Sequence, residues 1–109
     1  MRNAIAASAA LLLLTACSMT LSVRGIVQDS DESFSGTATG YLDGGGHLTV
    51  VSSKGVNCTG NFVYVTRRRG EGVFQCSDGR SGPFWFVSTG TRGTGHGTLG
   101  DQNFIFTFG

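Results

Sequence analysis

The sequence predicts an all-β domain, a single antiparallel meander of about eight short strands that is strongly twisted or curled into a barrel-like sheet. Short runs rich in Val, Thr, Phe and Tyr alternate with clusters of Gly, Asp, Ser and Asn at roughly ten-residue spacing, as in strands joined by turns. After residue 17, no stretch places apolar residues at helical spacing without an interrupting glycine. With 18 glycines and one proline, the chain also differs from proline-rich disordered segments.

The runs predict strands over residues 20–27, 34–41, 46–52, 57–65, 71–77, 83–88, 92–98 and 103–108. Alternation along the last strand places Phe104, Phe106 and Phe108 on one face, where phenylalanine rings would pack over glycine backbone. The other face would carry Val63, Val65, Trp85 and Val87. We expect the sheet to curl or close so that both sets are buried.

The N-terminus predicts export from the cytoplasm. Met1-Arg2-Asn3 supplies one positive charge and precedes the largely apolar run Ala4–Leu14. This run is shorter than the about 20 residues needed to span a bilayer, and it matches the apolar region of a signal peptide. We therefore expect residues 1–16 to be a signal peptide.

The next residues, Leu14-Thr15-Ala16-Cys17, resemble the lipobox of bacterial lipoproteins, in which an aliphatic residue and two small residues precede a cysteine. The resemblance implies cleavage before Cys17, acylation of this cysteine and a lipidated tether over residues 17–20. The partner of the anchor would be the lipid bilayer of the bacterial envelope. Ser18 favours the outer membrane over the inner one, on either its periplasmic or its surface face. An ordinary signal-peptide cleavage site is the alternative.

Cleavage would leave 93 of the 109 residues, with seven basic and seven acidic side chains. A neutral domain lacks the basic surface that binding of nucleic acid requires. With Cys17 acylated, Cys58 and Cys76 remain as a pair. In an oxidising compartment, two remaining cysteines predict one disulfide.

The glycines recur with a regular period. Gly36, Gly60 and Gly82 each follow Ser or Thr, at spacings of 24 and 22 residues, and a G-x-G pair follows each of them. Within a domain spanning residues 21–109, these units predict three hairpin repeats, near 34–55, 58–79 and 81–99.

The units resemble MORN repeats, which open with aromatic-x-Gly, carry G-x-G in the second strand and often close with Asp-Gly. The resemblance rests on Phe34-Ser-Gly36 with Gly44-x-Gly46, and on Cys58-Thr-Gly60 with Gly70-x-Gly72 and Asp78-Gly79. Ser81-Gly82-Pro83-Phe84 fits more loosely, and Cys58 stands where an aromatic residue is usual. MORN proteins are platforms for protein or lipid contacts, so the resemblance implies a binding role.

A hairpin centred on Arg67 pairs Cys58 with Cys76, Gly60 with Phe74, Phe62 with Gly72, and Tyr64 with Gly70. Opposed Cα atoms in antiparallel strands lie about 4.5–5.5 Å apart, within the usual disulfide range of about 4.4–6.8 Å. Each ring would also cover the glycine that it faces. This register therefore predicts a disulfide between Cys58 and Cys76.

Two further hairpins are predicted in the same way. A turn centred on Thr89-Gly90 would pair Phe84 with Gly95, Phe86 with Gly93, and Gly82 with Gly97. A turn through residues 100–103 would pair Leu99 with Phe104, Gly97 with Phe106, and Gly95 with Phe108.

Two features are candidates for contact with a partner. Arg67, Arg68 and Arg69 lie at a predicted hairpin tip, where they could contact anionic lipid or glycan carboxylates. A charged tip also keeps a turn soluble, which is the simpler explanation. Trp85 lies on the face opposite the glycine layer and is either a core residue or a partner contact.

The sequence predicts no catalytic residues, no metal site and no cofactor. It contains no G-x-S-x-G and no pair of carboxylates forced together. His47 and His96 have no carboxylate or thiolate at ligand spacing, so we expect them to be exposed strand residues. The glycines at 70–72 do not precede a helix, which excludes a phosphate-binding loop.

The sequence therefore predicts a membrane-anchored envelope lipoprotein that acts as a non-enzymatic binding or structural module, with an envelope protein or an anionic glycan or lipid as its partner. One alternative is a small inhibitor of an envelope hydrolase such as lysozyme, which would insert Arg67–Arg69 or Asp78–Arg80 into the active site. The other is a degenerate ligand-binding barrel, which requires a pocket with convergent polar groups.

Overall fold

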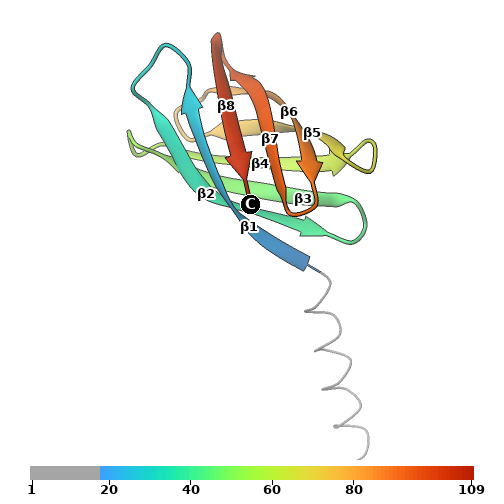
Figure 1. The fold of residues 1–109 in the computed structure, drawn as a ribbon. Coiled ribbons are helices and arrows are strands. Elements are labelled where there is room, and N and C mark those ends of the chain that lie inside the picture. The colour runs from blue at the N-terminus through green and yellow to red at the C-terminus, as the bar shows by residue number, and fades with distance from the viewer. Residues whose placement is uncertain (1–17) are drawn as a thin grey trace, which may run out of the picture.

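The computed structural model describes residues 18–109, which form a closed antiparallel barrel with its strands in sequence order (Figure 1). The strands are β1 (Ser18–Val27), β2 (Ser33–Tyr41), β3 (Gly45–Ser52), β4 (Asn57–Tyr64), β5 (Arg69–Cys76), β6 (Ser81–Thr89), β7 (Arg92–Leu99) and β8 (Gln102–Phe108). Antiparallel pairing of β1 with β8 closes the sheet. The predicted all-β meander is confirmed. The expected signal peptide and Cys17 lie outside the described residues.

The first strand is longer than expected. Residues 18–20, predicted to be part of a tether, belong to β1 and pair with Tyr41, Gly40 and Thr39. Because β2 extends to Tyr41, it offers backbone partners to the first residues of β1. Residues 18–109 contain no helix that is long and apolar enough to cross a membrane.

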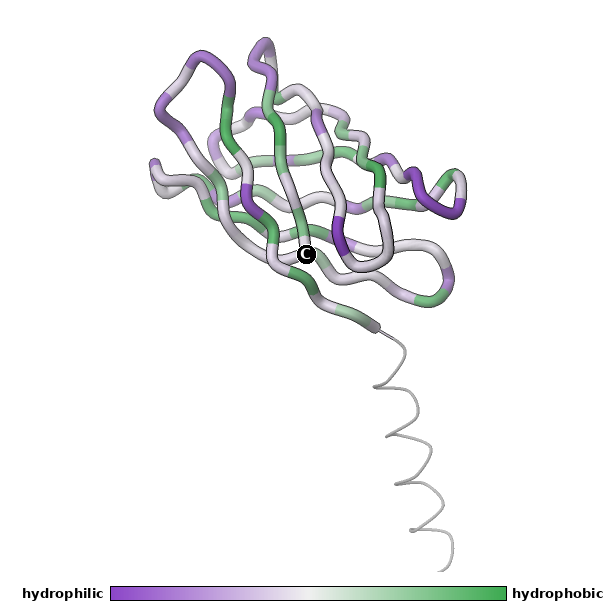
Figure 2. Tube along the Cα trace, in the orientation of Figure 1, coloured by the Kyte–Doolittle hydropathy of each residue, from purple (hydrophilic) through white to green (hydrophobic). Residues whose placement is uncertain are grey.

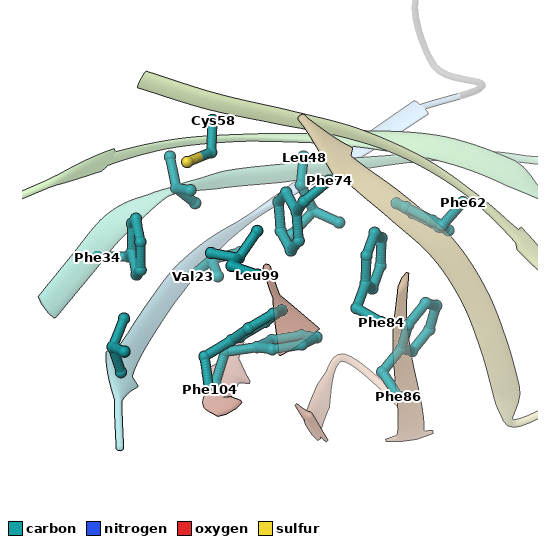
Figure 3. Close-up of a cluster of buried hydrophobic side chains, with 13 residues drawn as sticks. Val23, Phe34, Leu48, Cys58, Phe62, Phe74, Phe84, Phe86, Leu99 and Phe104 are labelled. Atoms are coloured by element: carbon teal, nitrogen blue, oxygen red, sulfur yellow. The ribbon is translucent and has the colours of Figure 1, made fainter. Parts of the chain in front are cut away.

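Large rings and glycines alternate around the inside of the barrel. One row runs from β3 to β8 as Gly46, Phe62, Gly72, Phe84, Gly97 and Phe104. An eight-stranded barrel has room for side chains but not for a bulky one from every strand, so small and large residues alternate. The buried cluster in Figure 3 is the result, and Phe84, which lies between Phe74 and Phe86, is fully buried.

The predicted register of the β4–β5 hairpin is confirmed. Cys58 pairs with Cys76, and their disulfide joins Cα atoms 4.0 Å apart. Gly60 contacts Phe74, as expected, and also Phe84. The rings that cover the other two glycines of this hairpin come from β6 rather than from β4, and Gly70 lies against Phe86. Gly72 lies against Phe84, rather than under its β4 partner Phe62, because the β6 rings lean towards β5.

The predicted registers of the two following hairpins are wrong by two residues. Phe84 pairs with Gly97 rather than Gly95, and Gly97 pairs with Phe104 rather than Phe106. The cause is the position of the turn glycines. Gly90 and Gly100, with φ of 65° and 63°, each take the first place of a two-residue turn, where tight hairpins require positive φ. A shift of two residues keeps every side chain on its predicted face.

The outer face is not buried as expected. Val63, Val65, Trp85 and Val87 remain exposed, and Trp85 keeps 42% of its surface accessible. Because the sheet closes on itself as a single layer, only its inner face is covered. The second apolar set therefore lies on the outer wall.

Candidate functional site

The two ends of the barrel differ in how they are filled. The open end comprises the start of β1, the end of β8 and the turns at 42–44, 65–68 and 90–91. The closed end comprises the turns at 28–32, 53–56, 77–80 and 100–101. Figure 1 shows the strands running between these ends, with β1 entering the barrel at the open end.

The closed half of the interior is packed. Phe34, Phe74, Leu99 and Phe104 are all buried, and the void that they line together with their neighbours has a volume of about 20 Å³. Phe74 packs on Phe84 with ring centroids 4.5 Å apart and on Phe104 at 5.5 Å. A void of this size holds no more than about one water molecule, so this half cannot admit a ligand.

An ion pair caps the closed half. The Glu32 side chain is 3% exposed, and its carboxylate accepts two hydrogen bonds from the Arg80 guanidinium, at 2.8 and 2.9 Å. Arg80 also donates to Asp78 at 2.8 Å and to the Gln102 side-chain oxygen at 3.0 Å. The hydrogen bonds from Arg80 hold the pKa of Glu32 below its ordinary value, although burial of the carboxylate opposes the shift.

The open half contains a cavity of about 270 Å³ that opens at the mouth of the barrel. Its described lining is Ser18, Met19, Leu21, Ala38, Gly40, Tyr41, Leu42, Leu48, Phe62, Tyr64, Phe86, Gly90, Phe106 and Phe108. None of these side chains is charged. Phe86 stands nearly perpendicular to Phe62 and Tyr64, with centroid distances of 5.2 and 5.3 Å, and the three rings form one wall.

The cavity exists because β2 supplies small residues to the interior. Ala38 pairs with Leu21, and Gly40 pairs with Met19 on one side and Gly46 on the other. A Cβ atom added at Gly40 would meet no atom of residues 18–109 within 4 Å. The space beside these residues therefore stays open, whereas the other inward glycines of the barrel wall lie against neighbouring backbone or rings.

Polar groups in the cavity are few and lie near its mouth. The Tyr64 hydroxyl donates to the Ser88 Oγ over 3.5 Å, which is a weak hydrogen bond. The Tyr41 hydroxyl lies 3.1 Å from Nδ1 of His47 at the outer rim. Burial of a charge without a partner is strongly unfavourable, so this cavity suits a neutral, largely apolar group.

The predicted contact residues lie outside the cavity. Arg67 and Arg68 are exposed in the open-end turn between β4 and β5, and Arg69 is exposed at the start of β5. Trp85 lies on the outer wall, 5.6 Å from the ring of His96. Arg80, considered above as part of an inhibitory turn, is bonded to Glu32, Asp78 and Gln102 instead. Within residues 18–109, no three His, Cys, Asp or Glu side chains are grouped to hold a metal ion.

Sequence reasoning did not identify the cavity lining. The available signal was the run of small residues at inward positions of β2, namely Gly36, Ala38 and Gly40. Gly36 lies against the backbone of Thr49, whereas Gly40 faces open space. Only the arrangement of the neighbouring strands distinguishes these two glycines.

Comparison with known proteins supports the fold. No protein-family model matches the sequence, and no curated protein matches it either. A redesigned β-barrel, mFAP1, solved bound to DFHBI, is 13% identical, with a TM-score of 0.67 over 82% of this chain and 90% of that chain. A de novo designed fluorescence-activating β-barrel is 18% identical, with a TM-score of 0.62 over 82% and 88% of the two chains. The protein is thus a small closed β-barrel with an apolar cavity at one end.

Proposed function

We propose that this protein is a lipid-anchored envelope protein whose barrel binds one small, largely apolar ligand in the open-end cavity. The cavity itself carries the proposal. At about 270 Å³ it approaches the lower limit of ligand pockets, about 300 Å³. It combines an apolar wall with a few polar groups at the mouth, as such pockets usually do.

The chemistry of the lining narrows the class of ligand. With no charged side chain in the lining, the buried part of the ligand is neutral, and any polar end stays at the mouth near Tyr41 and Tyr64. The Tyr41 and Tyr64 hydroxyls are hydrogen-bonded to His47 and Ser88 at the mouth, and the apolar wall behind them supports the binding of a ligand. The solved barrel with DFHBI adds a precedent for a small molecule bound by this fold.

The envelope location in this proposal rests on the N-terminal resemblance alone. A signal peptide over residues 1–16 and an acylated Cys17 would place the barrel at the outer membrane. Intact-mass measurement of the protein in the membrane fraction should show an acylated Cys17. A mass that corresponds to a free N-terminus at this cysteine would refute the anchor and leave the cavity proposal untouched.

A cavity-filling variant tests ligand binding. In Gly40→Phe, the new ring should occupy the mouth, because a Cβ atom at this position meets no atom of residues 18–109 within 4 Å and the cavity lies beside it. The probe is 1-anilinonaphthalene-8-sulfonate, displaced by decanol. The full chain should bind the probe, and Gly40→Phe should weaken binding by tenfold or more.

The matched control is Thr37→Phe, which adds the same ring to an exposed, outward position of the same strand. It should bind the probe as the natural protein does. Urea midpoints of both variants establish that the barrel is folded. Equal binding by folded Gly40→Phe and Thr37→Phe would refute the cavity as the site.

A further inference from the structure

The charged side chains are separated along the barrel axis. The closed-end turns carry five acidic and two basic residues, for a net charge of −3: Asp29, Asp31, Glu32, Asp78 and Asp101, with Lys54 and Arg80. The open-end turns and the strand ends beside them carry four basic residues and one acidic residue, for a net charge of +3: Arg67, Arg68, Arg69 and Arg92, with Asp43. The other charged side chains of residues 18–109, Arg24 and Glu71, lie between these ends. A domain with no net charge is therefore positive at its mouth.

Apolar side chains are exposed at the same end. Leu42, in the β2–β3 turn, is 84% exposed, and Met19 and Val65 are more than half exposed. Figure 2 shows the strongly hydrophilic tip of the β4–β5 hairpin at this end of the barrel. The rim thus combines basic and apolar side chains around the opening of an uncharged cavity.

Hydrogen bonds to backbone carbonyls hold the turn at residues 65–68, which carries Arg67 and Arg68, in place. The carbonyl of Arg68 accepts from the backbone N–H of Ser88 at 2.7 Å and from the Ser88 Oγ at 3.3 Å. The carbonyl of Arg69 accepts from the N–H of Val65 at 2.8 Å. The backbone of the turn is therefore fixed against β6, and the arginine side chains remain exposed at the rim.

We propose that the open end docks on an anionic lipid surface, with Leu42, Met19 and Val65 entering the interface and the four rim arginines contacting headgroups. Exposed apolar groups surrounded by basic side chains suit the boundary between headgroups and acyl chains. Anionic headgroups attract basic residues near the surface. The acidic closed end would be repelled, so the charge separation selects one orientation.

The path of the chain agrees with this orientation. β1 begins at Ser18, at the open end. Consecutive Cα atoms lie about 3.8 Å apart, so an anchor on Cys17 would hold the rim against the headgroups. The cavity would then open towards the lipid. Docking does not require a ligand in the cavity, and ligand binding is measured without vesicles, so either proposal can fail alone.

The orientation can be tested by fluorescence quenching. The full chain is reconstituted into vesicles of phosphatidylglycerol and brominated phosphatidylcholine, in a Trp85→Phe background that removes the single natural tryptophan. Leu42→Trp places a reporter on the rim, and Val51→Trp places one at an exposed position near the closed end. The reporter at 42 should be quenched strongly and the reporter at 51 weakly. Equal quenching at both positions, or none at 42, would overturn the proposal.

The contribution of the rim arginines to vesicle binding can be tested separately. The full chain then carries Cys17→Ser, which removes any acyl anchor. Each basic residue near an anionic surface contributes about a fivefold gain in affinity, so replacing Arg67, Arg68 and Arg69 with Gln should weaken vesicle binding about a hundredfold. Arg24→Gln, which removes one charge from the outer wall, should weaken binding less than Arg68→Gln. Unchanged binding by the triple variant, or equal losses in the two single variants, would contradict the docking.

Discussion

Glu32 and Arg80 are 48 residues apart in the sequence, yet two parallel hydrogen bonds of 2.8 and 2.9 Å join them across the closed end of the barrel. The pair links the loop between β1 and β2 to the turn between β5 and β6. Gln102 at the start of β8 accepts a further bond from Arg80. The Arg80 guanidinium therefore joins the β1–β2 loop, the β5–β6 turn and the start of β8.

Glu32→Gln should destabilise the barrel, because a partly buried guanidinium loses the carboxylate that accepts two of its hydrogen bonds and keeps only Asp78 as an anionic partner. Breaking a fully buried pair costs about 3–5 kcal/mol. Arg80 is 21% exposed, so we expect a smaller loss, about 2–3 kcal/mol in the free energy of unfolding by urea. Asp31→Asn is the control, since Asp31 is 90% exposed in its pair with Lys54. The control should cost less than about 0.5 kcal/mol. Equal losses in the two variants would contradict this role of Glu32.

The stabilisation by Glu32 should depend on pH in a defined direction. Its pKa in the folded state is lowered from the ordinary 4.5, chiefly by the hydrogen bonds from Arg80. A lowered pKa contributes stability that is complete above the pKa of the unfolded chain and is lost as the pH falls through the lower folded value. The difference in unfolding free energy between the natural protein and Glu32→Gln should therefore be constant near neutral pH and shrink below pH 4.5. A difference that stays constant down to about pH 3 would refute the assignment.

The inward glycines should differ sharply in their tolerance of a methyl group. A Cβ atom at Gly72 would collide with the Asn61 carbonyl oxygen and the Phe84 ring. Overpacking of this kind costs about 1–3 kcal/mol, so Gly72→Ala should lower the urea midpoint. Gly40→Ala places the same methyl group where no atom of the described residues lies within 4 Å, and its midpoint should be unchanged or higher. A similar loss of stability in both variants would show that close packing is not the reason for glycine at 72.

The fold was predictable because the residue pattern repeats along the whole chain. Alternation of period two and turn residues at regular spacing indicate strands, and alternation alone places Phe84 and Phe104 inside. The β4–β5 register could also be predicted, because placing Cys58 opposite Cys76 fixes every other residue pair of the hairpin. The β6–β7 register had no such constraint. It depends on whether Gly90 is the first or the second residue of the turn, and a shift of two residues leaves the inward faces unchanged.

The cavity was not predictable from the pattern, because it results from strands that are distant in the sequence. Gly40 and Gly46 look alike in the chain, yet the Phe62 ring lies against Gly46, whereas no side chain of the part of the chain that the structure describes lies against Gly40. The exposure of Trp85 has a similar cause. The sequence pattern is compatible with a curled sheet whose second layer buries the outer face as well. The closed barrel has a single layer, so its outer face remains in contact with solvent.

Removal of the disulfide should weaken the barrel without changing its topology. Cys58 and Cys76 close a loop with a sequence separation of 18, and Cys58 is 1% exposed. Restricting an unfolded loop of this length contributes about 3 kcal/mol. The Cys58→Ala/Cys76→Ala variant should therefore lose about 2–4 kcal/mol of unfolding free energy while its far-ultraviolet circular dichroism is unchanged. A variant that unfolds completely at room temperature would show that the barrel depends on the disulfide more than the packed closed half implies.

Enlarging the cavity should change which ligands the barrel prefers. Leu48 is 3% exposed and lines the inner part of the cavity, between its cross-strand partners Ala38 and Gly60. Because both neighbours are small, Leu48→Ala should extend the cavity rather than let it collapse. The variant should lose about 2–5 kcal/mol of unfolding free energy.

The measurement is the affinity for a series of straight-chain alcohols. Each further methylene that the cavity buries should contribute about 0.8 kcal/mol, or about fourfold in Kd. Affinity should stop rising when the cavity is full, and Leu48→Ala should shift this limit to longer chains. Leu99→Ala is the matched control, because Leu99 is 2% exposed but lies in the packed closed half, away from the cavity. It should cost similar stability and leave the limit unchanged. The same limit in all three proteins would mean that the alcohols do not bind in the open-end cavity.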